Sequence, residues 1–250
     1  MAKAGPEFLV ALDFDDTISI GKLPREYIIL EATAKLHGLS LPDEGLIRDV
    51  YGYSREVMNS FYWPELIQDS AMFRTVLNSM HQIEKQLDEQ GALPSVYLAN
   101  GVMDAASDIR KMKGSIGIFS AKDADRIKYT AERIGLEIDR NFDFCIGGNL
   151  RYPKGTSLFF VPLINRLGAW VASTPSFYVG DALPDYLSVI MSPRRYPDFN
   201  IDFIGVTTGA LSYNDWIVLG LPKNKIMSNI ADLPNYTQRN LSTNIQNIVN

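Results

Sequence analysis

Acidic side chains follow an apolar run near the start of the chain, in the order Asp13-Phe14-Asp15-Asp16-Thr17. In an extended strand alternate side chains share a face, so Asp13 and Asp15 point the same way and Phe14 points away. Two carboxylates this close repel each other, and one holds a proton unless a cation lies between them. Such a pair can divide the labour between an ionised nucleophile or metal ligand and an acid. Taken alone, the pattern is equally typical of acidic residues that cap a helix.

Further polar residues follow later apolar runs. Ser120 comes directly after Ser115–Phe119, and its hydroxyl can donate to a phosphate oxygen. Lys154, in the loop 152–156, can neutralise a phosphate. Gly180 permits a tight turn before Asp181, and Asp185 lies four residues later, where one helical turn brings the two carboxylates together. Oxygen ligands of this kind suit Mg²⁺.

Short apolar runs separated by helical patterns must position these side chains. The five expected strands are Phe8–Leu12, Ser115–Phe119, Phe142–Ile146, Ser176–Val179 and Asp202–Val206. Alternation of strands and helices predicts an α/β, Rossmann-like parallel sheet with helices on both faces. Ligands bind outside the carboxyl ends of such strands. The polar residues above are therefore expected to converge at one edge of the sheet.

A long stretch after the first strand has helical patterns and no strand pattern. Apolar residues recur at three- and four-residue spacing in 70–90 and again in 27–36. Glycine and proline accumulate at 19–23 and 93–100, which marks the joints. We predict a Rossmann-like core, 1–19 and 98–250, with a small α-helical cap domain, 20–97, inserted into it. The chain after Asn235 is either a final helix or a loose tail.

Composition narrows the function classes. The 250 residues carry a net charge of −5 and no long basic run, which disfavours nucleic-acid binding. No segment has the apolar length of a membrane span, and Met1–Glu7 lacks the pattern of a signal peptide. Cys145 is the single cysteine, so an internal disulfide is excluded, and we expect its side chain to pack in the core. We expect His37 and His81 to have structural roles. A cytoplasmic protein is expected, of undetermined oligomeric state.

Together these motifs resemble the phosphatases of the haloacid dehalogenase superfamily, over nearly the whole chain. The first motif of that family, Asp-x-Asp-x-Thr, is met by Asp13, Asp15 and Thr17. The later motifs are met by Ser120, by Lys154, and by Gly180, Asp181 and Asp185. The helical stretch is similar to the cap that many members insert after the first motif, as phosphoglycolate phosphatase-like members do.

The resemblance implies a role for each matched residue. Asp13 would attack phosphorus to form an aspartyl-phosphate, and Asp15 would act as general acid and base. Mg²⁺ would be held by Asp13, the backbone carbonyl of Asp15, Asp181 and Asp185. Phosphate oxygens would be bound by a set of polar groups: Ser120, Lys154 and the backbone at Asp16 and Thr17.

The sequence departs from the family pattern in two places. Members often carry Lys-Pro at the third motif, whereas here the order is Pro153-Lys154; Lys122 is a less suitable substitute. The connection 192–200 is longer than usual, and the role of its Arg194 and Arg195 is left open. In the cap, residues around Gly52 are candidates for substrate contact: Arg48, Tyr51, Tyr53 and Arg55.

The predicted function is Mg²⁺-dependent hydrolysis of a small phosphorylated metabolite. An acid at Asp15 argues for an oxygen leaving group, and Thr17 favours a phosphatase over a sugar phosphomutase. A phosphomutase of the same superfamily and a non-catalytic phosphate-binding regulatory protein remain alternatives. The physiological substrate is not indicated by the sequence.

Overall fold

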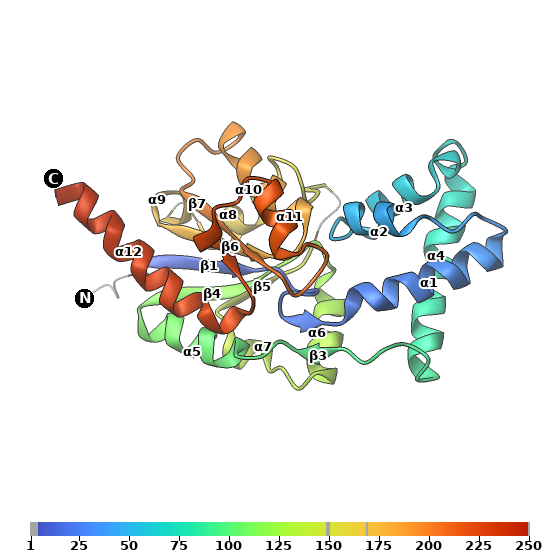
Figure 1. Ribbon diagram of the computed structural model, residues 1–250, viewed down its shortest axis with the longest axis horizontal. Coiled ribbons are helices and arrows are strands. Elements are labelled where there is room, and N and C mark those ends of the chain that lie inside the picture. Colours follow the sequence, from blue (N-terminus) through green and yellow to red (C-terminus); the bar gives the residue numbers. More distant parts are fainter. Residues whose placement is uncertain (1–4, 149–150, 169, 250) are drawn as a thin grey trace.

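The computed structural model describes residues 5–148, 151–168 and 170–249, without the side chains of 172–173 and those after Leu241. Its centre is a six-stranded parallel sheet in the order β5-β4-β1-β6-β7-β8 (Figure 1). The strands are β1 (Phe8–Leu12), β4 (Gly114–Phe119), β5 (Phe144–Ile146), β6 (Ser176–Gly180), β7 (Ile201–Val206) and β8 (Ile226–Met227). The expected α/β fold class is confirmed.

The strand order creates a switch point beside β1. From β1 the chain adds β4 and β5 on one side of it, and then β6, β7 and β8 on the other. In register, Leu12 of β1 lies between Ile118 of β4 and Val179 of β6. The residues that directly follow β1, β4 and β6 therefore meet where ligands bind in open α/β sheets.

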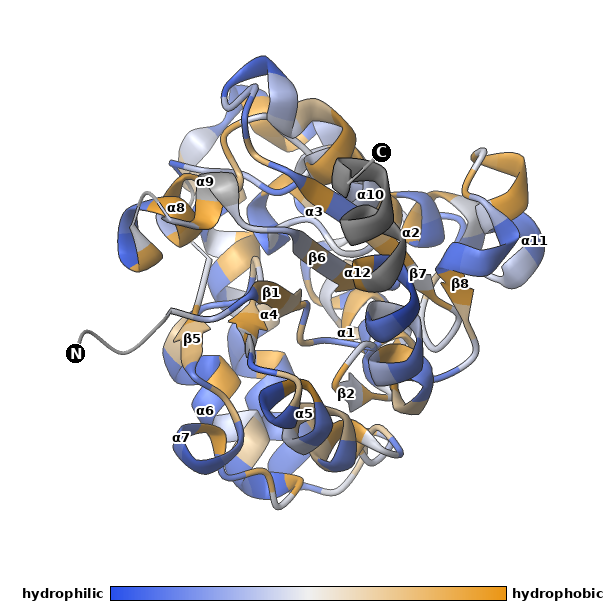
Figure 2. Ribbon diagram, turned by 90° about the vertical axis from the view of Figure 1, so that its left-hand side faces the viewer, coloured by the Kyte–Doolittle hydropathy of each residue, from blue (hydrophilic) through white to orange (hydrophobic). Residues whose placement is uncertain are grey.

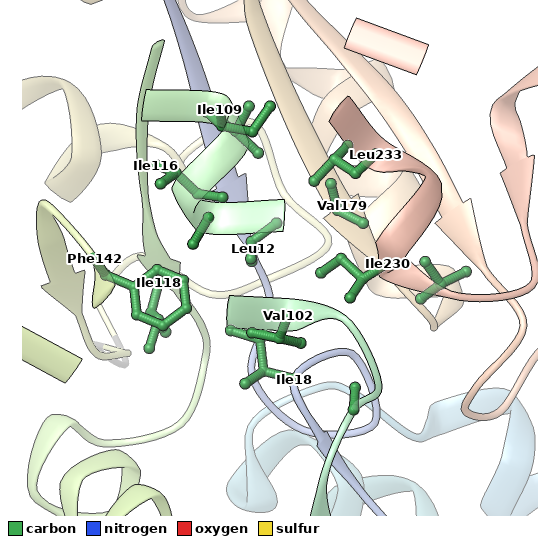
Figure 3. Close-up of a cluster of buried hydrophobic side chains, with 14 of the residues drawn as sticks. Leu12, Ile18, Val102, Ile109, Ile116, Ile118, Phe142, Val179, Ile230 and Leu233 are labelled. Carbon is green, nitrogen blue, oxygen red and sulfur yellow. The ribbon is translucent and has the colours of Figure 1, made fainter. Parts of the chain in front are cut away.

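Alternating side chains of the strands supply a core on each face of the sheet. Phe8, Val10 and Leu12 belong to one apolar cluster, while Leu9 and Ala11 belong to another. The first face is covered by helices α5 (Val102–Lys111), α6 (Ala124–Arg133) and α12 (Leu233–Val249), with the short α7 (Ile138–Asn141) beside them (Figure 3). The second is covered by α8 (Val161–Leu167), α9 (Trp170–Ser173), α10 (Leu183–Met191) and α11 (Tyr213–Val218) (Figure 2). Burial on both faces explains the near-continuous apolar strands.

The stretch after β1 is helical, as expected. Its elements are β2 (Ser19–Ile20), α1 (Lys22–His37), α2 (Glu44–Val50), α3 (Arg55–Tyr62), the 3-10 helix η1 (Pro64–Gln68), α4 (Ser70–Glu89) and β3 (Tyr97–Leu98). β2 and β3 pair antiparallel where the chain leaves and rejoins the sheet. The helices share an apolar cluster of their own and extend away from one end of the sheet (Figure 1). The division into core and cap domains stays a prediction.

Element boundaries differ from the expectation in a few places. The third strand begins at Phe144 and not at Phe142, because Phe142 ends α7 with its amide bonded to Ile138. The short strands β2, β3 and β8 were not predicted, because two residues carry no periodicity. The end of the chain forms α12 and is not a loose tail. Residues 1–4, part of the segment examined for a signal peptide, lie outside the described residues.

Among the residues that the structure describes, no helix is both long and apolar enough to cross a lipid bilayer.

Candidate active site

Asp13 stands at the end of the central strand, at the switch point. Its amide donates to the carbonyl of Val179 at 2.9 Å, which continues the β1–β6 pairing by one residue. One carboxylate oxygen, Oδ2, lies 3.0 Å from Nζ of Lys154. The other, Oδ1, is buried and has no hydrogen-bond partner among the described residues. The carboxylate of Asp13 is therefore held by Lys154 through Oδ2, while Oδ1 is left without a partner among the described residues.

Lys154 links Asp13 to the residues that follow β6. Its Nζ also lies 2.8 Å from Oδ1 of Asp185, and its side chain is fully buried. Burial lowers the pKa of this amine, but the charges of Asp13 and Asp185 outweigh burial and hold the pKa above its ordinary value. The structure thus places the lysine of the Pro153-Lys154 motif where the resemblance required it, despite the inverted order.

Asp181 and Asp185 come from the turn between β6 and the start of α10. The hydroxyl of Thr17 donates to Oδ1 of Asp181 at 3.2 Å. Asp185 accepts from the hydroxyl of Tyr178 at 2.8 Å. Gly180 is required here, because a Cβ on it would lie 2.3 Å from Cγ of Asp185. The glycine lets the two acidic residues of this motif fold back against the strand.

Three carboxylates from distant parts of the chain form an acidic cluster. Ligand oxygens of Asp13, Asp181 and Asp185 lie within 4.8 Å of one another, and all three residues are buried. Burial and the neighbouring carboxylates raise the pKa of Asp181 well above its ordinary value. Burial likewise raises the pKa of Asp185 to about 7, although Lys154 opposes this shift. One lysine among three carboxylates leaves a negative excess.

This cluster fits a divalent cation. The donors are hard oxygen ligands, which Mg²⁺ prefers, and Oδ1 of Asp13 is a buried acceptor with no described donor. Burial, together with repulsion from neighbouring carboxylates, raises the pKa values of Asp181 and Asp185, and a bound cation would stabilise their ionised forms. The residues predicted as side-chain ligands are therefore brought together. Asp185 is the most engaged of them, because its oxygens accept from Tyr178 and Ala182 and also contact Lys154. Among the described residues, those of Asp181 accept only from Thr17 and Ala210.

Asp15 lies apart from this cluster and pairs with Lys122, whose Nζ is 2.8 Å from Oδ1 of Asp15. Burial raises the pKa of Asp15, but the charges of Lys122, Lys22 and Arg126 outweigh burial, and its pKa is lowered. Burial lowers the pKa of Lys122 to about 8, against the pull of Asp15. Lys122 is thus no substitute for Lys154, because it pairs with Asp15 and not with Asp13.

Asp16 has a structural position and not the expected phosphate-binding one. Its carboxylate accepts from the amides of Gly21, Lys22 and Leu23 at 2.7–2.9 Å and from the hydroxyl of Tyr51 at 2.7 Å. Its own amide donates to the carbonyl of Ser19 at 2.8 Å. With these groups engaged, Asp16 fixes the start of α1 beside the loop that follows β1. The hydroxyl of Thr17 donates to Asp181, and phosphate binding by the backbone amide of Thr17 stays a prediction.

A cavity of about 400 Å³ opens above these groups. Asp13, Asp15, Ser120, Lys154 and Asp181 line it from the sheet side. Of the four substrate-contact candidates, three line it from the helical side: Tyr51, Tyr53 and Arg55. Space between the helical segment and the sheet is therefore continuous with the carboxylates.

Other candidates have different surroundings. Arg48 is exposed and is absent from the described residues that line the cavity, so the structure does not bring it to the site. Arg55 reaches the cavity but forms ion pairs with Glu26 and Glu84, each at 2.9 Å. Arg194 and Arg195 are exposed, and neither is among those lining residues.

The sequence analysis missed several residues of the site. His81 was taken as structural but lines the cavity, and Lys22, Arg25, Glu84 and Arg126 line it as well. These residues lie on α1, α4 and α6, where charged residues are ordinary for an exposed helix face. Lys122 had the clearest signal, since it follows Ser120 by two residues. Cys145 is partly buried and packs against the first core cluster, as expected.

No protein-family model matches the chain, and no curated protein matches it. Solved structures do. A haloacid dehalogenase-like family hydrolase from Streptococcus pneumoniae is 16% identical, with a TM-score of 0.66 over 92% of this chain and 97% of that one. A predicted phosphoglycolate phosphatase from Haemophilus somnus is 17% identical, with a TM-score of 0.66 over 92% and 97%.

The β-phosphoglucomutase of Clostridium difficile is 16% identical, with a TM-score of 0.71 over 96% of this chain and 99% of that one. Sequence identities this low show similarity of the fold alone. The similarity covers both the sheet and the helical stretch inserted after β1. The protein therefore has the haloacid dehalogenase-like fold.

Proposed function

We propose that this protein is a Mg²⁺-dependent phosphatase that hydrolyses a phosphate monoester through an aspartyl-phosphate on Asp13. The proposal rests on the contacts of the two carboxylate oxygens of Asp13 at the switch point. Lys154 holds one of its oxygens, and the other is buried and uncommitted. A fixed carboxylate with a free lone pair is the arrangement that a nucleophile needs.

Asp13, Asp181 and Asp185, with the backbone carbonyl of Asp15, would hold the Mg²⁺, which when bound supplies positive charge against the phosphoryl oxygens. Ser120 and Lys154 line the same cavity and would bind those oxygens. Phosphoryl transfer depends mostly on this kind of positioning and charge stabilisation. The buried side chains of Ser120 and Lys154 are held in place before substrate arrives.

Asp15 would move the protons. In the first step a carboxylate oxygen of Asp13 would attack phosphorus while the bond between phosphorus and the ester oxygen breaks. The leaving ester oxygen would take the proton that Asp15 acquires from solvent when substrate binds. In the second step Asp15 removes a proton from water, which attacks the phosphorus and frees Asp13. Lys122 keeps Asp15 ionised in the resting protein. The negative phosphate of an arriving substrate acts in the opposite direction and raises the pKa of Asp15.

The alternatives make different products. A phosphomutase would use the same side chains but return an isomeric phosphate ester, whereas a binding protein would bind the ester and leave it intact. The β-phosphoglucomutase among the similar structures shares the fold, so the fold does not separate the two enzymes. Phosphate release separates all three functions.

The test is a panel of phosphate monoesters, assayed for phosphate release with Mg²⁺ and with EDTA. Wild type should release phosphate only with Mg²⁺, and Asp13→Asn should lose at least about a thousandfold in kcat while keeping its circular dichroism spectrum. Asp49→Asn, at an exposed position outside the cavity lining, is the matched control. Equal activity of Asp13→Asn and wild type would refute the nucleophile.

A further inference from the structure

A second cavity, of about 760 Å³, adjoins the candidate active site between α4 and α6. That volume lies in the range of sites for small molecules. It shares six lining residues with the first cavity, and these mark a common wall: Lys22, Arg25, His81, Glu84, Lys122 and Arg126. The second cavity is therefore directly adjacent to the one at Asp13.

The second cavity is positively charged in a protein whose net charge is −5. Among the described residues, the cations lining it are Lys22, Arg25, Lys85, Lys122, Arg126 and Arg133. Only two carboxylates, Glu84 and Asp88, line it with them. An excess of positive charge in one partly enclosed place attracts an anion.

Each of these two carboxylates serves several cations. Glu84 lies 2.6 Å from Arg126, 2.9 Å from Arg55 and 3.7 Å from Lys22. Asp88 lies 2.7 Å from Arg25 and also pairs with Arg133. Asp15 pairs with Lys122 and Glu89 with Lys85, so the six described lining cations share four carboxylates and leave an excess of two positive charges beside the cavity.

Arg25 gives an independent indication of a ligand. It is only 5% exposed, and its Nε is buried without a hydrogen-bond partner among the described residues. Its other nitrogens bind the carbonyl of Pro94 at 3.0 Å and Asp88 at 2.7 Å. A buried guanidinium N–H without a partner is costly, which is the expected state of a donor whose acceptor arrives with a ligand.

Three of these cations, Lys122, Arg126 and Arg133, lie in a row that starts beside Asp15 and continues along one face of α6. Lys122 precedes the helix and contacts Asp15. Arg126 and Arg133 are seven residues apart, which places them on the same face and about 10 Å apart along the axis. Positive side chains therefore line a path from the general acid, where the leaving group would sit, into the second cavity.

We propose that the second cavity binds a second anionic group, a phosphate or a carboxylate, on the leaving group of the substrate. This inference rests on the proposed phosphatase function. It specifies the substrate class as phosphate monoesters with a distal negative charge. The ester bond to be cleaved lies at Asp13, and the distal anion lies against Arg25, Arg126 and Arg133.

The test compares esters that differ in the distal anion. The probes are fructose 1,6-bisphosphate against fructose 6-phosphate, and 3-phosphoglycerate against glycerol 3-phosphate. The readout is the ratio of kcat/KM within each pair. The wild-type ratio should favour the bis-anionic ester at least tenfold in one pair, and Arg126→Gln and Arg133→Gln should each lower that ratio by about tenfold, as loss of a charged hydrogen bond does.

Lys128→Gln is the matched control. It removes one positive charge from the same helix, at an exposed position that is not among the cavity-lining residues, and should leave the ratio within twofold of wild type. Arg133 has the more exposed side chain of the two arginines, 48% against 38%, so its variant folds even if Arg126→Gln does not.

The outcomes separate this inference from the proposed function. Turnover without preference for the bis-anionic esters, or a preference that both arginine variants retain, overturns the inference and leaves a phosphatase. If no ester is hydrolysed, the proposed function fails, and calorimetry with fructose 1,6-bisphosphate decides the inference. Binding that Arg126→Gln or Arg133→Gln weakens tenfold supports the anion cavity, and binding that neither weakens, or no binding, refutes it.

Discussion

At the scale of single residues, Lys154 holds two carboxylates of the acidic cluster together. Its amine lies between Asp13 and Asp185, and the next amide, that of Gly155, donates to the hydroxyl of Ser188 at 2.7 Å. The loop is therefore anchored to α10 directly beside the lysine. This anchor explains why the order Pro153-Lys154 still delivers the amine to Asp13.

Lys154→Met should abolish phosphate release and destabilise the protein by about 3 kcal/mol, because it leaves buried carboxylates without their cation. Urea unfolding in the presence of EDTA measures the stability loss. Lys128→Met, at an exposed position on α6, should change the free energy of unfolding by less than about 0.5 kcal/mol. An unchanged unfolding midpoint in Lys154→Met would show that the ion pairs do not stabilise the fold.

Mg²⁺ should raise the melting temperature of the wild-type protein by several degrees, since an ion that binds only the folded state stabilises it. Burial and repulsion from neighbouring carboxylates raise the pKa values of Asp181 and Asp185, and such an ion would stabilise their ionised forms. Differential scanning calorimetry with Mg²⁺ and with EDTA measures the shift. Asp181→Asn should lose most of it, whereas Asp49→Asn should keep it; equal shifts in the two variants would argue against the metal site.

At the scale of elements, the turn between α2 and α3 meets the start of α10. Gly52 has φ of +94°, and a Cβ on it would lie 2.7 Å from Cβ of Ala182. Ala182 directly follows Asp181. A side chain at position 52 would therefore collide with the residue that directly follows Asp181.

Gly52→Ala should destabilise the protein by about 2–4 kcal/mol, the sum of left-handed backbone strain and a steric clash. It should also lower kcat/KM, because the turn that carries Tyr51 and Tyr53 must move. Gly38→Ala is the matched control: its φ is +64°, but no atom lies within 4 Å of the added Cβ. It should cost only about 1–2 kcal/mol and leave kcat/KM unchanged. Identical effects of the two substitutions would exclude the contact with Ala182.

The elements that the sequence predicted are those with a strong period or a continuous apolar run. The helix expected at 70–90 is found as Ser70–Glu89, and all five expected strands are present with small shifts at their ends. These strand ends were enough to predict the convergence of Asp13, Asp181 and Asp185. Asp13 and Asp181 directly follow buried strands, and Asp185 lies in the first turn of the next helix, so topology places these three. Lys154 lies in the longer connection between β5 and α8, where the strand pattern alone does not fix its position.

The rest of the site depends on packing between elements, which no local pattern encodes. The pairing of Lys122 with Asp15 joins residues 107 positions apart. The backbone amide of Asp16 was expected to bind phosphate because it stands inside the first motif, but it donates to the carbonyl of Ser19 at 2.8 Å. Arg48 lies four residues before Gly52, yet it sits on the exposed side of α2.

At the scale of the whole molecule, ion pairs connect the helical segment to the sheet-bearing part. Arg126 and Arg133 of α6 pair with Glu84 and Asp88 of α4. Burial raises the pKa of Glu84, but Arg55, Arg126 and Lys22 outweigh burial and hold the pKa well below its ordinary value of 4.5. These contacts determine how firmly the two parts are held together over the cavities.

Glu84→Gln should destabilise the protein by about 3 kcal/mol at pH 7, because three cations lose their shared carboxylate. A carboxylate with a depressed pKa contributes stability above its ordinary pKa and loses it as pH falls. The difference between wild type and variant should therefore be constant from pH 7 to about 5.5 and shrink steadily below pH 4.5. Urea unfolding at each pH measures it. Glu89→Gln, with its exposed pair to Lys85, should show almost no difference at any pH.

The contacts of Asp16 have a consequence for any motion of the helical segment. This one carboxylate binds the first amides of α1 and the hydroxyl of Tyr51, while its backbone neighbours are the two residues assigned to proton transfer and to contact with Asp181. A rotation of α1 therefore pulls on the peptide between them. In the proposed phosphatase, a substrate that displaces α1 would therefore also displace Asp15, the proposed general acid.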